Sequence, residues 1–224
     1  MASTYRWRKH REYRDGLHVS KTLSSTRWSA RYDAVHAVTM RFRQNITMLE
    51  EMSVDNDQPA NCRNESKGFV TRFEQLESGI LLEVWHTVLQ QSQKISLSLQ
   101  ERNLSLNSAV LLLESLLGCV ERQRTEFDAF QERGKLKCNN NEYKCAEIRL
   151  KKYKKQFEDG PAEDTILSQR EKFKVEVFFP IIDQLSASLR YRLAAYESVC
   201  HMFGFFLRND SICPTVKSKL RLPI

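Results

Sequence analysis

Glycine and proline are scarce in this sequence, with seven and five residues among 224. Both residue types mark turns, and folds built from many short strands need them often. Their scarcity argues against a turn-rich β fold and favours long helices, so we expect a mostly α protein. The chain makes one large domain or two small ones, and it is long enough to bury a proper core.

The sequence also lacks cysteine and histidine at metal-ligand spacing. Six cysteines occur at positions 62, 119, 138, 145, 200 and 213, with no Cys-x-x-Cys pair among them. Neither a zinc site nor a disulfide framework is indicated, so we expect reduced thiols, no metal and no cofactor.

Long apolar runs are missing as well. No run reaches the length of a membrane span, and the basic N-terminal residues are not followed by the apolar core of a signal peptide. We therefore expect an intracellular protein without a membrane partner. In such a protein the four Asn-x-Ser/Thr matches are chance matches rather than glycan sites.

Known catalytic signatures are absent. The sequence contains no glycine-rich phosphate loop, no Gly-x-Ser-x-Gly and no His-Glu-x-x-His. Its five histidines are scattered; His86, beside Trp85, is a candidate buried titrating group, although a lone histidine in a helix is more often structural. We expect no active site, no small-molecule substrate and no enzyme.

Positive charge is concentrated in two blocks. The net charge is +7 overall, but residues 1–31 carry +6, residues 32–132 carry −6 and residues 133–155 carry +7. Such blocks contact nucleic acid or act as nuclear-import signals in some proteins and are plain solvated loops in many others.

Apolar residues recur every three or four positions through most of the chain, which predicts amphipathic helices. Polar and turn-prone stretches near 53–67 and 134–144 predict loops, Ser105 is a candidate N-cap, and Pro180 predicts a kink in the last helix. The longer predicted helices cover about residues 28–51, 79–102, 106–133 and 165–206, with a shorter one near 69–76, and the third is expected at the centre of the bundle.

The N-terminal part has a different character. Residues 1–24 are basic, and the alternating stretch 17–23 predicts one or two short strands without a partner sheet. Residues 207–224 have no helical period and are expected to form a frayed basic tail.

Residues 24–35 read Ser-Ser-Thr-Arg-Trp-Ser-Ala-Arg-Tyr-Asp-Ala-Val. Thr26 is a suitable N-cap for the helix that follows. This segment resembles the Thr-Arg-Trp-Ser-Ala-Arg stretch of hAT-family transposases and their domesticated relatives, especially the transposase-like region of zinc finger MYM-type proteins. Stretches 95–116 and 173–183 are similar to that family in the same order along the chain.

The resemblance implies an RNase H-like fold interrupted by an all-helical insertion domain. Residues 1–24 would then be a remnant of the RNase H-like core, and residues 25–206 the insertion domain. The family's Asp-Asp-Glu metal triad, its N-terminal zinc finger and its dimerisation segment would lie outside this chain.

Two functional hypotheses follow. The first is a catalytically inactive, transposase-derived helical module that sits in the nucleus, or otherwise in the cytoplasm, and contacts DNA weakly through its basic segments. The second is a module for protein interaction or self-association; a degenerate fragment without function is a further alternative. The candidate nucleic-acid-binding residues are Arg27, Trp28, Arg31, Lys151, Lys152, Lys154 and Lys155.

Overall fold

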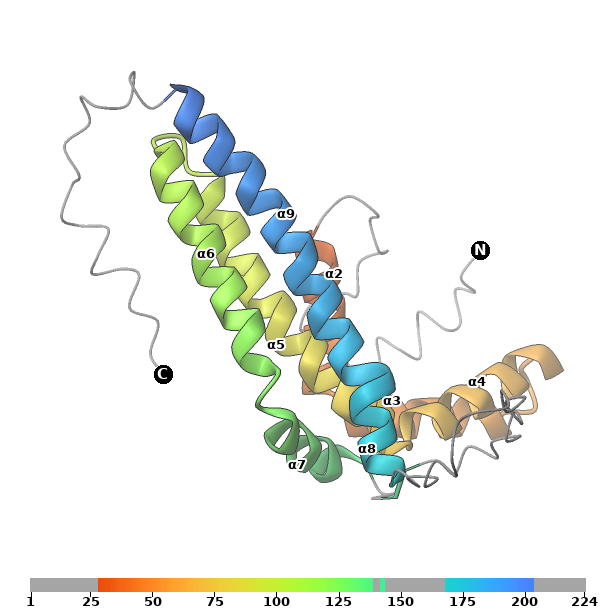
Figure 1. Cartoon of the computed structure of the whole chain (residues 1–224). Helices are drawn as coiled ribbons and strands as arrows, with labels where there is room; N and C mark the ends of the chain where they lie inside the picture. Colours follow the sequence, from red (N-terminus) through yellow and green to blue (C-terminus); the bar gives the residue numbers. More distant parts are fainter. Residues whose placement is uncertain (1–27, 139–141, 144–167, 204–224) are drawn as a thin grey trace, which may run out of the picture.

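A computed structural model describes residues 28–138, 142–143 and 168–203 (Figure 1). Within these ranges the chain forms helices joined by short turns, and no strand occurs there, so the mostly α prediction is confirmed for them. The predicted segments 1–24 and 207–224 and the cap at Thr26 lie outside the described residues. The elements are α2 (Trp28–Met40), α3 (Phe42–Val54), α4 (Ala60–Phe73), α5 (Leu76–Leu99), α6 (Leu106–Gln123), α7 (Phe127–Lys137), α8 (Gln169–Phe173), the π-helical turn η1 (Lys174–Phe178) and α9 (Phe179–Phe203).

The long helices α5, α6 and α9 lie side by side, and α5 is the central helix of the fold (Figure 1). It packs against α2, α6 and α7 and supplies five residues of the main core cluster, Leu76, Ile80, Val84, Val88 and Ile95. The prediction that residues 106–133 form the centre is wrong. Leu111 of α6 is 49% exposed, so α6 also has a solvent-facing side.

The helix predicted over 106–133 is two helices. α6 begins at Leu106, where the Ser105 hydroxyl accepts from the backbone N–H of Ser108 and confirms the predicted cap. It ends at Gln123, and α7 begins at Phe127 after a short turn. The change of direction places Phe127 and Phe130 of α7 in the core, with almost no exposed surface.

Close packing joins α7 to the first turns of α5. Gly79 of α5 and Gly134 of α7 face each other, and a Cβ built on Gly134 would come within 2.9 Å of the backbone nitrogen of Ile80. Because neither glycine has a Cβ, the two helices can approach this closely. The predicted loop near 134–144 is wrong in its first part, because residues up to Lys137 are helical.

The predicted helix over 28–51 is also divided. α2 ends at Met40, and Arg41, with φ −122° and ψ 33°, separates it from α3. α3 and α4 then form a helical hairpin that extends to one side of the long helices (Figure 1). A small second core cluster, centred on Phe42, Ile46 and Cys138, lies at its base.

Most of the predicted loop near 53–67 belongs to this hairpin. Only residues 55–59 connect α3 to α4, because Pro59 is followed directly by a helix that starts at Ala60 and runs to Phe73. The buried positions of α4 are Cys62 and Ser66, one turn apart. Because only two positions are buried and the other residues are mostly polar, the composition of α4 resembles that of a loop. The shorter helix predicted near 69–76 ends at Phe73, and α5 starts at Leu76, earlier than predicted.

The last helix contains a π-helical turn. A capping box formed by Ser168 and Glu171 starts α8, and η1 follows immediately before α9. The backbone N–H of Phe179 bonds to the carbonyl of Lys174, five residues back. Pro180 has no N–H for an α-helical bond, and the π turn lies just before it. The kink predicted at Pro180 stays a prediction.

The π turn changes which residues face the core. Phe173, Phe178 and Ile182 are buried, so the step across the turn is five residues instead of three or four. A uniform helical period from Phe173 would place Ile181 on the buried side, but Ile181 is only half-buried and Ile182 is buried instead. Beyond the turn, α9 is tied to α6 by an ion pair between Arg190 and Glu121 at 2.6 Å and by another between Arg124, which follows α6, and Asp183.

Candidate functional site

Three neighbouring helices bring pairs of titratable side chains together. Each pair is spaced by one helical turn, which puts both members on the same face of their helix. The pairs are Tyr32 and His36 on α2, Glu83 and His86 on α5, and Arg133 and Lys137 on α7. We call these six residues the α2–α5–α7 cluster.

A stack of aromatic rings connects α2 to α5. Nδ1 of His36 lies 3.0 Å from Nε2 of His86, so the two imidazoles share a hydrogen bond. Their ring centroids are 5.2 Å apart and their planes differ by 18°. Tyr32 stacks beside both, with centroid distances of 5.3 Å to His36 and 6.2 Å to His86.

A buried carboxylate lies one turn from His86. The side chain of Glu83 is 9% exposed and pairs with two cations, through Oε2 with Nε of Arg133 at 3.2 Å and through Oε1 with Nζ of Lys137 at 3.1 Å. Lys137 also donates to the backbone carbonyl oxygen of Thr39 near the end of α2, at 3.1 Å. One lysine thus links α2, α5 and α7.

These surroundings favour the neutral form of His86. Burial is the largest cause that lowers the pKa of His86 below 6.5, and the nearby His36 and Lys137 lower it further. Glu83 acts in the opposite direction. His86 therefore takes up a proton less readily than a free imidazole does.

Sequence reasoning found one member of this cluster. His86 was considered as a candidate buried titrating group, and it is half-buried. Its partner His36 is fifty positions away, so no spacing rule connects the two before the fold is known. The only signal in the sequence was that the two members of each pair are three or four residues apart, and this spacing is common in helices.

Of the candidate nucleic-acid-binding residues, only Trp28 and Arg31 fall within the described ranges. Trp28 is the first residue of α2, and Arg31 is exposed in the first turn of that helix. Arg27 and the four lysines at 151, 152, 154 and 155 lie outside the described residues.

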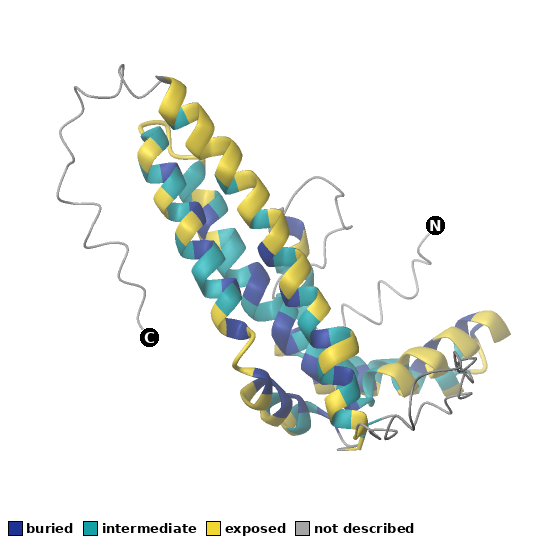
Figure 2. Cartoon of the chain, viewed as in Figure 1, coloured by how far each residue is buried: buried dark blue, intermediate teal, exposed yellow. Residues whose placement is uncertain are grey.

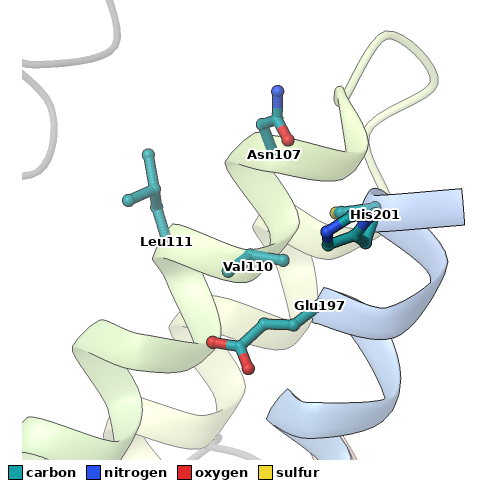
Figure 3. A pocket seen from close by; sticks show the side chains of 6 residues that line it. Asn107, Val110, Leu111, Glu197 and His201 are labelled. Atoms are coloured by element: carbon teal, nitrogen blue, oxygen red, sulfur yellow. The ribbon is translucent and has the colours of Figure 1, made fainter. Parts of the chain in front are cut away.

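A second feature is a pocket between the far ends of α6 and α9 (Figure 3). Its volume is about 440 Å³, and side chains of both helices line it. They are Asn107, Val110, Leu111, Glu197, Cys200 and His201. No group of three histidine, cysteine or carboxylate side chains in the described part of the chain is placed to hold a metal ion.

The second half of α9 also exposes apolar side chains. Exposed residues dominate α9 beyond Leu189, in contrast to its first turns (Figure 2). Tyr191 is 80% exposed and Met202 61%, and Tyr196 and Val199 are exposed as well. We call Tyr191, Tyr196, Val199 and Met202 the α9 apolar surface.

In comparisons with known proteins, no family model, no curated protein and no solved structure matches this chain. None of the helices in the described ranges is long and apolar enough to cross a membrane.

Proposed function

We propose that this chain is a catalytically inactive, transposase-derived helical module that associates weakly with nucleic acid in the nucleus. The observation that carries the proposal is the distribution of charge. An acidic stretch, residues 32–132, is flanked by blocks of +6 and +7. The acidic stretch would repel phosphate groups, and the two basic blocks would attract them.

The exposed position of Arg31 supports this proposal. Arg31 is the last residue of the +6 block, and its side chain is exposed in the first turn of α2. The resemblance of residues 24–35 to hAT-family transposases also supports association with DNA, because in that family the Arg-Trp pair is ascribed a role near the DNA end.

Binding to duplex DNA across a salt series tests the proposal. Neutralised phosphates release counterions, so the logarithm of the affinity should fall linearly with the logarithm of salt concentration, with a slope of about −0.9 per contact. Replacing the lysines at 151, 152, 154 and 155 by glutamine should flatten the slope by as much as about 3.6. Lys67→Gln and Lys94→Gln, in the acidic stretch, serve as controls and should leave it unchanged.

No binding at low salt, or binding that does not respond to salt, would contradict nucleic-acid association. A strand-cleavage assay with added divalent metal tests the catalytic part separately. We expect no cleavage above background, and cleavage that requires the metal would contradict inactivity.

The α9 apolar surface favours a second candidate function, protein interaction or self-association. Contiguous apolar residues on a surface often mark an interface. Tyr191→Lys combined with Met202→Lys should then shift a concentration-dependent oligomer toward the monomer in light scattering. Leu136→Lys is the matched control, because Leu136 is 82% exposed but lies on α7. A wild-type chain that stays monomeric and binds no apolar dye would count against this function.

A further inference from the structure

α2 is attached to the rest of the molecule differently from its neighbours. It packs along α5, yet no residue from 30 to 40 belongs to either hydrophobic core cluster, although Ala30 is buried. Residues 32–38 are all half-buried. The side-chain contacts that join α2 to α5 and α7 include the ring stack of Tyr32, His36 and His86 and the bond from Lys137 to the backbone carbonyl of Thr39.

The hydrogen bond between the two imidazoles depends on their protonation. A neutral pair forms the bond with one ring nitrogen as donor and the other as acceptor. A pair with one extra proton keeps the bond, since an imidazolium donates to a neutral imidazole and charge strengthens such bonds. A pair with two extra protons has two donors facing each other at 3.0 Å, with no acceptor and with repelling charges.

The other charged groups at this site do not offset a second proton. Glu83 is the one acidic group among those that act on His86, and its two carboxylate oxygens already pair with Arg133 and Lys137. Glu83, Arg133 and Lys137 together carry a net positive charge. A doubly protonated pair would therefore add charge to a surrounding that is already positive.

We propose that the Tyr32–His36–His86 stack is a proton-sensitive attachment of α2 to α5: α2 is docked while the histidine pair holds at most one extra proton, and it detaches when both rings are protonated. This inference does not depend on the proposed function. It concerns the helix that directly follows the basic residues 1–27 in the sequence.

The direction of the pH effect follows from proton counting. The detached state takes up two protons near and below pH 6.5, whereas the docked state takes up at most one. Because the pKa of His86 is lowered in the folded chain, docking is stable above 6.5 and is lost as pH falls below that value. With one proton of difference, the equilibrium constant for detachment rises about tenfold per pH unit.

Amide hydrogen exchange of the wild-type chain between about pH 7.5 and about pH 5.5 tests this, once intrinsic exchange rates are corrected. We expect α2 to lose protection by about tenfold per unit below pH 6.5, while α6 stays protected. Unchanged protection of α2, or an equal loss in α2 and α6, would overturn the proposal.

A double variant tests the role of the two rings. His36→Phe with His86→Phe keeps both rings but removes both titrating groups, so the pH-dependent loss of protection in α2 should disappear. His201→Phe is the matched control, because His201 is exposed on α9 and should leave the wild-type response unchanged. A pH response that persists in the double variant would overturn the proposal.

If circular dichroism shows that the double variant is unfolded at pH 7.5, nitrogen-15 spectra of the wild-type imidazoles decide. We expect the second ring of the pair to take up its proton in the same pH range in which α2 loses protection. Two fully protonated rings in a chain with a fully protected α2 would overturn the proposal.

Discussion

Two buried glutamines differ in whether their amide groups are hydrogen-bonded. The oxygen of Gln131 accepts from the hydroxyl of Tyr143 and from Nε of Arg170, each at 2.8 Å. Gln123, at the end of α6, is 2% exposed, and neither its amide oxygen nor its amide nitrogen has a partner. A buried amide without partners costs free energy, whereas a bonded one is close to neutral.

We therefore predict opposite effects for the same substitution. Gln123→Leu should raise the free energy of unfolding by about 1–2 kcal/mol, because it removes an unsatisfied polar group. Gln131→Leu should lower it by about 1–3 kcal/mol, because it leaves the hydroxyl of Tyr143 and Nε of Arg170 without their acceptor. Urea unfolding measures both, and a destabilised Gln123→Leu would contradict the reading of that site.

Glu83 allows a second prediction at this scale. Glu83→Gln removes the charge that pairs with Arg133 and Lys137, and hydrogen bonds to charged groups contribute about 1.5–3 kcal/mol, so we expect a loss of about that size. Glu132→Gln is the control, since Glu132 pairs with Lys135 on the surface and should change stability by less than about 1 kcal/mol. Equal effects in urea unfolding would show that burial does not matter here.

Single residues could be predicted where their signal is local. Ser105 was identified as a cap from its position before an apolar period, and its hydroxyl accepts the expected bond. Glu83 gave no such signal, because a carboxylate in a helix usually lies on the polar face. Its burial and the pairing of His36 with His86 depend on tertiary contacts, which the spacing of residues along one helix does not contain.

At the scale of elements, the close approach of α5 and α7 makes a sharp prediction. Gly134→Ala would place a Cβ 2.9 Å from both the backbone nitrogen and Cγ1 of Ile80, so the helices would have to separate. We expect a loss of about 1–3 kcal/mol in the free energy of unfolding. Gly118→Ala, at an open position in α6, should instead gain up to about 1 kcal/mol from helix propensity.

Thermal and urea unfolding measure both glycine variants. A Gly134→Ala chain as stable as wild type would contradict the tight packing of α5 on α7. A loss in Gly118→Ala would indicate that this helix position is not open.

The presence of the helices could be predicted from the sequence, but the turns that divide two of the predicted helices could not. The period of apolar residues located most of the long helices, but it ran through Arg41 and through residues 124–126, where the chain turns. Neither turn contains glycine or proline, so the usual markers are missing.

At the scale of the whole molecule, the α3–α4 hairpin should open more readily than the long helices, because among the described residues its core contacts with the remainder are confined to its base. We expect amide exchange in the distal part of α4 to be at least tenfold faster than in α5 under native conditions, because opening there exposes little buried surface. Equal protection in α4 and α5 would show that hairpin and bundle open together.

The mostly α architecture could be predicted because composition acts on the whole chain at once. Scarce glycine and proline together with a helical period leave few other choices. Which helix is central could not be predicted from the sequence, because both α5 and α6 are apolar enough to occupy the centre. α5 holds it because α2 and α7 also pack there, and those contacts join residues far apart in sequence.

The π turn before Pro180 has a consequence for sequence length. It contains one residue more than an α-helical turn, so losing a residue from 174–178 would rotate all of α9 by about 100° relative to α8. Asp183 and Arg190 would then point away from Arg124 and Glu121. Homologous chains with this fold should accept amino-acid changes at the exposed positions Val175 and Glu176 of that turn, but no single-residue gap.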